Sequence, residues 1–148
     1  MATATHGLHG YYVEDLSEGM SAGYTKTVTE ADVVIFAGIS GDNNPVHINE
    51  EYARETPFKG RLVHGMLSAS LISTVLGTRL PGPGCIYIDQ QLKFTAPVAI
   101  GDTVTATATV LEVGERGRVS LKTTCTVGDK VVVDGVATVK VNRREKAK

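Results

Sequence analysis

Two side chains suited to proton transfer, Asp42 and His47, lie five positions apart in the stretch SGDNNPVH, which runs from residue 40 to residue 47. Pro45 fixes its own φ and disfavours the α conformation at Asn44, so the turn between the two side chains is restricted in shape. Such a turn could aim a carboxylate and an imidazole at one point. A carboxylate can take a proton from water, and an imidazole can share or return protons near neutral pH. The spacing therefore indicates general acid–base chemistry on a water molecule.

Two other interpretations of this turn use the same residues. Asp and Asn in turns commonly accept hydrogen bonds from their own backbone, which would give Asp42 a purely local role. A calcium loop is a poorer match, because Val46 stands where a third oxygen ligand is required and the glycine of a calcium loop is missing. The residues alone leave the water-activating site and the local turn both open.

A second candidate for chemistry is the stretch LVHGML, residues 62–67, at the start of an apolar segment. The free N–H groups at a helix N-terminus, together with the helix dipole, can bind an oxyanion, and Gly65 would let a carbonyl oxygen approach closely. The alternatives are structural. Gly65 could simply permit tight packing of the helix against a sheet, and His64 could be an ordinary, partly buried histidine with local hydrogen bonds.

The elements that must position these residues follow from hydrophobic periodicity. A strand is expected over residues 24–28, and Thr29 is placed as the N-cap of a helix that begins near Glu30, with Asp32 three residues after the cap. The breakers of residues 40–45 end this helix in a polar loop. A short helix is expected over residues 49–55.

The second half of the chain predicts one enclosed helix followed by strands. Residues 65–76 are mostly apolar on several sides, as in a helix surrounded by other elements, and Gly77 is expected to end it. Strands are predicted at residues 86–94, 103–113, 119–127 and 131–141. The last three are separated by short glycine-containing connections, which predict antiparallel hairpins. The fold class is therefore α+β, with an antiparallel sheet wrapped around one central helix.

Composition narrows the classes of function. A chain of 148 residues with 42% hydrophobic content is expected to form one domain, and its net charge of -1 does not favour nucleic-acid binding. Cys85 and Cys125 belong to no metal-binding cluster and are expected to be reduced thiols. No secretory signal is recognised at the N-terminus, and the apolar run at residues 66–76 is too short to span a bilayer. We therefore expect a cytoplasmic enzyme without a membrane segment.

The pattern F-x-x-x-S-G-D-x-N-P-x-H from Phe36 to His47, followed by V-H-G-M at residues 63–66, resembles the (R)-specific enoyl-CoA hydratases of the MaoC-like, hydratase-2 group. The stretches YIDQQLKFTAPV and GDTV later in the chain resemble the same family. The resemblance implies a single hot-dog domain over residues 21–142, in which a curved antiparallel sheet wraps a central helix. Residues 1–20 are expected to be flexible, and residues 143–148 form a charged tail.

Site residues follow from the resemblance position by position. Asp42 and His47 match the catalytic pair of the family, which holds one water for addition to C3 of a trans-2-enoyl thioester and gives an (R)-3-hydroxyacyl product. Gly65 matches the residue whose N–H holds the thioester oxygen, and Ser73 matches a further active-site hydroxyl. Asn44 is expected to fix the loop or to contact substrate.

The resemblance also implies partners. The substrate is an acyl-CoA, with no cofactor and no metal, and the protein is expected to be a homodimer or a dimer of dimers with an acyl tunnel near the interface. Lys59, Arg61 and Lys93 are candidates for binding the CoA phosphates. Three alternatives stay open: a dehydratase acting on acyl carrier protein, a thioesterase, and a non-catalytic acyl-binding module.

Overall fold

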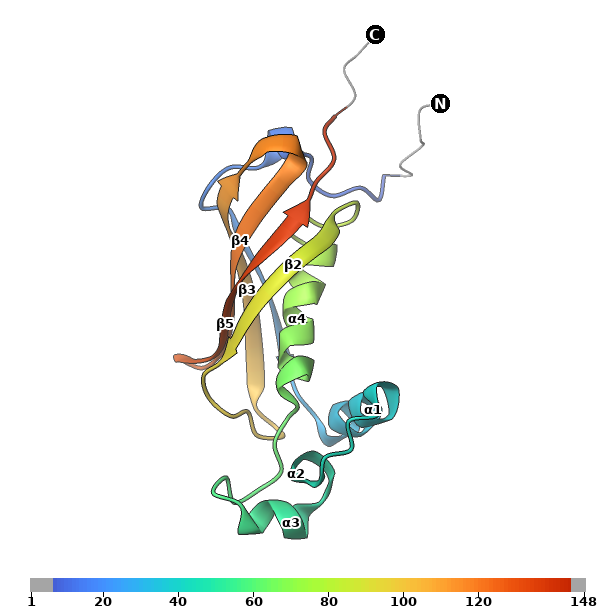
Figure 1. The fold of residues 1–148 in the computed structure, drawn as a ribbon, viewed down its shortest axis with the longest axis vertical. Helices are drawn as coiled ribbons and strands as arrows, with labels where there is room; N and C mark the ends of the chain where they lie inside the picture. The colour runs from blue at the N-terminus through green and yellow to red at the C-terminus, as the bar shows by residue number, and fades with distance from the viewer. Residues whose placement is uncertain (1–6, 145–148) are drawn as a thin grey trace.

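Five antiparallel strands form one twisted sheet in the order β1-β3-β4-β5-β2, and the long helix α4 lies along one face of it (Figure 1). The structure is a computed structural model and describes residues 7–144. Its strands are β1 (Ser21–Thr27), β2 (Ile86–Phe94), β3 (Thr103–Val113), β4 (Arg118–Val127) and β5 (Lys130–Lys140). Its helices are η1 (Val13–Asp15), α1 (Glu30–Ser40), α2 (Pro45–Ile48), α3 (Glu50–Glu55), α4 (Gly65–Thr78) and η2 (Glu115–Gly117).

The alternation of Thr with Val or Ala along β3 produces the two faces of the sheet. Val104, Ala106, Ala108 and Val110 are buried beneath α4, while the intervening threonines are more exposed. The predicted hairpins are confirmed, because β3 pairs with β4 and β4 pairs with β5, both antiparallel. The α+β prediction is therefore confirmed, with the sheet wrapped around the central helix.

Helix α4 buries one side against four strands, β1, β3, β4 and β5. Ile72, Val75 and Leu76 are almost completely buried on that side. Burial of a side chain of this size stabilises the fold by roughly 1.5–3 kcal/mol. The helix continues through Gly77 to Thr78, so the prediction that Gly77 ends it is wrong by one residue.

The boundaries of the other elements differ slightly from the predicted ones. Strand β1 begins at Ser21 rather than Tyr24, because its pairing with β3 continues to Ser21, whose hydroxyl lies 3.0 Å from the Thr109 hydroxyl. Helix α1 begins as predicted, since the Thr29 hydroxyl accepts from Asp32 N–H and the Asp32 carboxylate accepts from Thr29 N–H.

The N-terminal residues that the structure describes are packed onto the domain. Val13 and Leu16 are buried in the core, and backbone hydrogen bonds join Gly10 to Pro83 and Val13 to Asn142. Arg144 also pairs with Asp15. The packed unit therefore begins earlier than the expected boundary at residue 21, while residues 1–6 and 145–148 lie outside the described part of the chain.

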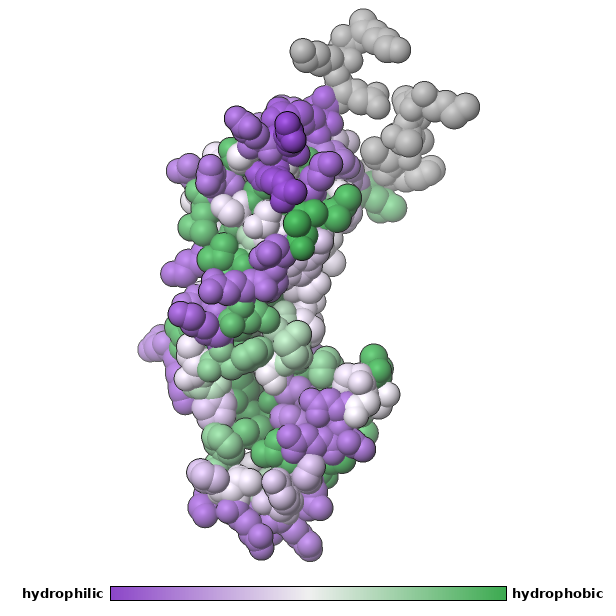
Figure 2. All heavy atoms as spheres, viewed as in Figure 1, coloured by the Kyte–Doolittle hydropathy of each residue, from purple (hydrophilic) through white to green (hydrophobic). Residues whose placement is uncertain are grey.

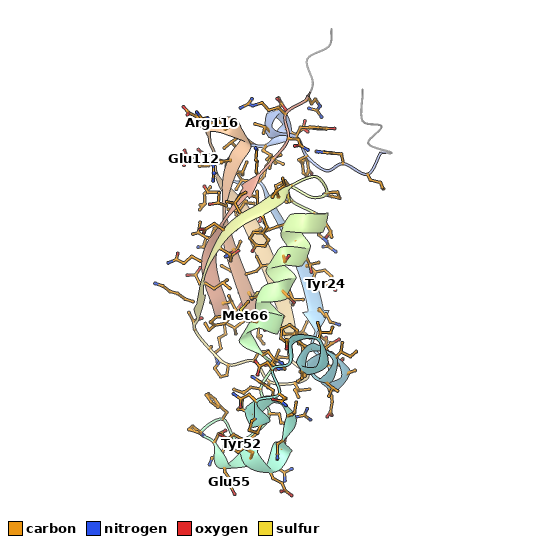
Figure 3. The ribbon with its side chains drawn as sticks, turned by 45° about the vertical axis from the view of Figure 1, so that its right-hand side comes forward. Tyr24, Tyr52, Glu55, Met66, Glu112 and Arg116 are labelled. Carbon is orange, nitrogen blue, oxygen red and sulfur yellow. The ribbon has the colours of Figure 1, made fainter. Side chains whose placement is uncertain are left out.

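Helices α1, α2 and α3 lie together at one end of the sheet, below the N-terminus of α4 (Figure 1). In Figure 3, Tyr52 and Glu55 of α3 are at the opposite end of the molecule from Glu112 and Arg116. The chain enters this helical end after β1 and leaves it at Gly65. All residues of the two candidate motifs therefore lie at or near this end.

The single glycine within β5 provides a test of the sheet. A Cβ at Gly135 would overlap the carbonyl oxygen of Gln91 on β2, so the two strands could not pair without a shift. Gly135→Ala is expected to lower the free energy of unfolding by about 1–3 kcal/mol, measured by urea unfolding. The control is Gly77→Ala, which meets no neighbouring atom and should be neutral or stabilising by roughly 0.5–1 kcal/mol because it lies in a helix. An equal effect of the two substitutions would contradict this packing.

Candidate active site

The turn between α1 and α2 places Asp42. Gly41 ends α1 in the left-handed conformation, at φ 76°, and its N–H binds the carbonyl oxygen of Ala37. Asp42 N–H donates to the Ser40 hydroxyl, and one carboxylate oxygen of Asp42 accepts from Asn44 N–H at 3.3 Å. The local turn considered as an alternative is thus formed. The second carboxylate oxygen takes part in none of the hydrogen bonds of residues 7–144, and Asp42 is exposed.

The side chain of Asn44 binds the backbone of the same turn. Its side-chain oxygen accepts from Val46 N–H at 3.1 Å and caps α2, whose first residue is Pro45. The expected polar loop therefore gives way to a four-residue helix that carries His47. Of the two roles expected for Asn44, the structure shows the one that fixes the loop.

His47 is oriented by a carbonyl oxygen. Its Nδ1 lies 2.8 Å from the Leu62 carbonyl oxygen, and since a carbonyl can only accept, Nδ1 carries the proton. In the neutral ring Nε2 is then a hydrogen-bond acceptor. The carbonyl of Leu62 is itself held in place, because Leu62 N–H donates to Val46 and Val63 N–H donates to Val98.

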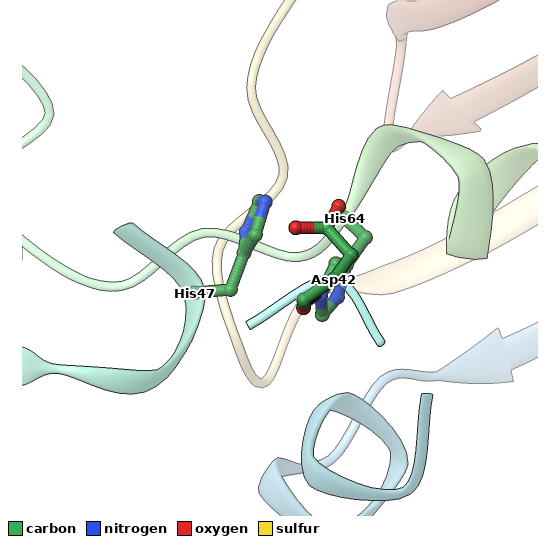
Figure 4. A group of neighbouring side chains, drawn as sticks. All are labelled: Asp42, His47 and His64. Atoms are coloured by element: carbon green, nitrogen blue, oxygen red, sulfur yellow. Dashed lines mark hydrogen bonds between the residues drawn. The ribbon is translucent and has the colours of Figure 1, made fainter. Parts of the chain in front are cut away.

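A third titratable side chain, His64, joins Asp42 and His47 (Figure 4). The rings of His64 and His47 stack with centroids 3.9 Å apart, and His64 Nε2 donates to the backbone carbonyl of Asp42 at 2.9 Å. His64 is only 1% exposed. The alternative interpretation of His64 as an ordinary histidine with local hydrogen bonds is wrong in one respect, because its hydrogen-bond partner is 22 residues away in the chain. Its place directly before Gly65 was the available signal.

The cluster has the composition of some metal sites but not their geometry. Potential ligand atoms of Asp42, His47 and His64 lie within 4.8 Å of one another. His47 Nδ1 and His64 Nε2 are already bonded to the carbonyl oxygens of Leu62 and Asp42, and the remaining nitrogen of His64 belongs to a side chain that is only 1% exposed. This arrangement suits a water molecule better than a four-coordinate metal, and the absence of a metal stays a prediction.

Gly65 is the first residue of α4, and its N–H is used by none of the hydrogen bonds recorded for residues 7–144. A Cβ at this position would lie 2.8 Å from two ring atoms of Phe94. The packing interpretation of Gly65 is therefore correct, and it is compatible with a free amide at the positive end of the helix dipole. This amide can donate to an oxygen atom that approaches past the glycine.

A cavity of about 460 Å³ adjoins His47 and Gly65. Its walls are mainly apolar, and the apolar side chains among them include Phe58, Leu62, Val63, Phe94, Val132 and Val133. The buried hydroxyl of Ser68 also lines it and has no hydrogen-bond partner among the described residues. The cavity therefore suits an apolar group attached to a polar head that reaches the His47 and Gly65 end.

Ser73 does not join this cluster within the chain. It lies eight residues after Gly65, about 12 Å along the helix. It lines a separate hollow of about 570 Å³ between α4 and β2, together with Phe36, Met66 and Tyr87. Burial raises the pKa of Tyr87 to about 12, so this phenol stays neutral at physiological pH. The role of Ser73 stays a prediction.

The three candidate cations differ in their surroundings. Arg61 is already engaged, since its guanidinium pairs with Glu30 at 2.5 Å and its Nε donates to the His47 carbonyl at 2.8 Å. It therefore holds α1 and α2 together. Lys59 and Lys93 are exposed, and their binding of phosphates stays a prediction.

Comparison with known proteins gives consistent relatives. The family model described as a MaoC-like domain matches residues 14–135. The chain is 60% identical to an (R)-specific enoyl-CoA hydratase of Rhodospirillum rubrum over 90% of this chain and 94% of the relative. It is 53% identical to a 3-hydroxybutyryl-CoA dehydratase of Methylorubrum extorquens, over 92% and 87% of the two chains.

Solved structures are similar over nearly the whole chain. The unliganded R-hydratase PhaJ1 from Pseudomonas aeruginosa has a TM-score of 0.87 and 42% identity, with 94% of this chain and 93% of that chain covered. The (R)-hydratase from A. caviae involved in PHA biosynthesis has a TM-score of 0.84 and 42% identity, with 86% and 98% covered. The hot-dog fold expected from the sequence is thereby confirmed.

The capping role of Asn44 can be measured. Asn44→Ala removes the acceptor for Val46 N–H and is expected to lower the free energy of unfolding by about 1 kcal/mol in urea titrations, whereas Asn44→Asp should retain the cap. Asn43→Ala is the matched control, because this exposed neighbour has no recorded side-chain hydrogen bond. A loss as large in Asn43→Ala as in Asn44→Ala would argue against a specific cap.

Proposed function

Since the chain belongs to the MaoC-like domain family, we propose that it is an (R)-specific enoyl-CoA hydratase. It is a hydro-lyase that adds water to a trans-2-enoyl-CoA, gives an (R)-3-hydroxyacyl-CoA, and catalyses the reverse dehydration. The observation that carries the mechanism is the close approach of the Asp42 carboxylate to the His47 ring, with ligand atoms within 4.8 Å, beside a cavity that His47 and Gly65 line together.

The two acceptors orient one water. A water that donates one hydrogen to the Asp42 carboxylate and the other to His47 Nε2 keeps a lone pair free for attack on C3. As the oxygen–C3 bond forms, one proton passes to the carboxylate. The same carboxyl group can return that proton to C2 on the same face, which gives syn addition. Dehydration follows the same steps in reverse.

Gly65 stabilises the charge that develops during this addition. Attack at C3 moves electron density through C2 to the thioester oxygen, which becomes an enolate-like oxyanion. The Gly65 N–H and the N-terminus of the 14-residue helix α4 are already in place to receive it. Loss of a donor of this kind commonly lowers the rate by roughly 10²–10³-fold.

Besides water, the acyl-CoA substrate is the only small molecule that this mechanism requires. The apolar cavity beside His47 and Gly65 accepts the part of the thioester next to the reacting carbons, and Lys59 and Lys93 are available for the CoA phosphates. No helix in the described residues is long and apolar enough to cross a membrane. A cytoplasmic location is part of the proposal, and by similarity to the A. caviae enzyme, which is involved in PHA biosynthesis, we also propose that the chain supplies precursors for polyhydroxyalkanoate synthesis.

The proposed assembly is a homodimer through β2. This strand is at the edge of the sheet and exposes Ile86, Tyr87, Ile88 and Phe94. Figure 2 shows apolar residues along this side of the molecule. An exposed apolar edge strand favours pairing with another chain. Pairing of two β2 strands would join the sheets edge to edge and would enclose the hollow that contains Ser73.

Substitution of the two water-binding residues tests the function. Asp42→Asn and His47→Gln are each expected to keep the fold and to lower kcat for crotonyl-CoA hydration by at least about 10²-fold, followed as loss of the enoyl absorbance. Asn43→Ala, in the same turn, is the control and should retain near-normal turnover. Near-normal turnover in Asp42→Asn or His47→Gln would refute the assignment. Chiral analysis of the product should give the (R) isomer. Faster turnover of the acyl-carrier-protein thioester than of the CoA thioester would show that acyl carrier protein, and not CoA, is the preferred carrier.

The dimer is tested by mass in solution. Light scattering should give about twice the chain mass of 15.7 kDa, or four times if dimers pair. Ile88→Lys should shift the protein toward the monomer, because it places a charge on the apolar edge. Leu111→Lys is the control, since this residue is comparably exposed but lies on β3, away from the edge. A wild-type monomer would contradict the proposed assembly.

A further inference from the structure

We propose that His64 is the positioning residue of this active site, setting the relative placement of Asp42, His47 and the Gly65 amide. The proposal rests on the proposed hydratase function and adds a residue to its machinery. His64 lies directly before Gly65 in the chain, stacks on His47 and binds the backbone of Asp42. Among residues 7–144, it is the only residue that adjoins Gly65, stacks on His47 and binds the backbone of Asp42.

The hydrogen bond to Asp42 is the first part of the evidence. His64 Nε2 donates to the Asp42 carbonyl at 2.9 Å, and on the other side of the residue Asp42 N–H donates to Ser40. The backbone of Asp42 is therefore held at both its amide and its carbonyl. Because Asp42 is in an exposed turn, this bond is its direct link to the buried side chain of His64, the residue that precedes α4.

The contact with His47 is the second part. The His64 ring lies between Phe36, with centroids 4.8 Å apart, and His47, at 3.9 Å. The Leu62 carbonyl fixes one nitrogen of His47 but allows the ring to tilt about that bond. The stack with His64 limits this tilt and keeps Nε2 directed toward the water. Figure 4 shows the three side chains grouped together between α2 and the start of α4.

The third part is an unpaired atom. His64 Nδ1 is buried and has no hydrogen-bond partner among the described residues. A phenylalanine would stack in the same place without burying an unpaired acceptor, so a histidine is not the most stable choice for this position. The property that only histidine adds is the Nε2–H donor to Asp42. A functional requirement for that donor explains why a less stable side chain occupies the site.

The arrangement also explains why His64 is not placed in direct contact with substrate. Its donor is used by Asp42, its ring stacks on His47 and makes a tilted contact with Phe36, and it is 1% exposed. It therefore acts through its neighbours. Removal of the donor should misplace the reacting groups and lower kcat, while binding of the acyl chain and of CoA should change little.

Two variants separate the donor from the ring. His64→Phe keeps the stack and loses the donor, and it is expected to lower kcat for crotonyl-CoA hydration by about 10–100-fold, with KM within about threefold and no loss of stability in urea unfolding. His64→Gln keeps an N–H donor and should recover part of kcat. Leu121→Ala, in the core of β4, is the control for stability, because it should destabilise the fold and leave kcat of the folded protein unchanged.

Two results would overturn the proposal: kcat of His64→Phe within twofold of wild type, or a loss of stability that accounts for the loss of activity. A second measurement does not depend on turnover. Nitrogen-15 NMR should show His64 as the Nε2–H tautomer, and His64→Phe should shift the amide signals of Asp42 and Asn43. If wild type fails to hydrate crotonyl-CoA, the hydratase proposal fails, whereas the NMR arm still decides whether His64 positions Asp42. The opposite tautomer, or unchanged Asp42 signals, would refute the positioning role.

Discussion

The packing of α4 into the face of the sheet determines where chemistry can take place in this molecule. Ile72, Val75 and Leu76 bury one side of the helix against four strands, so the helix cannot slide or rotate without exposing apolar surface. Its N-terminus is consequently a fixed point at the end of the sheet. The amide of Gly65 and the positive end of the helix dipole lie at that point. Phe94 packs so closely against Gly65 that a larger residue could not fit there without a shift. Every other part of the site is placed relative to this amide.

The flexible elements of the site are tied to that fixed point by a few bonds that span the chain. Leu62 binds the backbone of Val46, the His47 ring binds the Leu62 carbonyl, and His64 binds the carbonyl of Asp42. Arg61 adds a link between α1 and α2. A turn that is exposed to solvent thereby acquires a defined position, which is the usual way for a rigid scaffold to carry function on loops. The proposed acceptors for water, Asp42 and His47, and the proposed donor for the oxyanion, Gly65, come from different elements but are linked by these bonds.

The same region contains features that do not favour stability. His64 Nδ1 and the Ser68 hydroxyl, four residues apart on α4, are both buried without a partner among the described residues. The β2 edge also exposes large apolar side chains in the single chain. Unpaired polar atoms and apolar edges each cost free energy. His64 and Ser68 lie next to the proposed site, and exceptions of this kind to the rules of stable packing are expected at functional sites.

Local patterns were sufficient to predict most of the elements and to select Asp42 and His47 as a candidate pair, which the structure brings close together. The Thr and Val alternation of β3, the Thr29 cap and the breakers after Ser40 act within a few positions, and the D-x-N-P-x-H motif identified Asp42 and His47. Tertiary structure alone decided that His64 binds a residue 22 positions away, that Arg61 is occupied by Glu30, and that Ser73 faces a different hollow from Gly65. The physical reason is that periodicity reports which face of an element is buried. It does not report which distant side chain meets it, because that depends on how helices and strands pack in three dimensions.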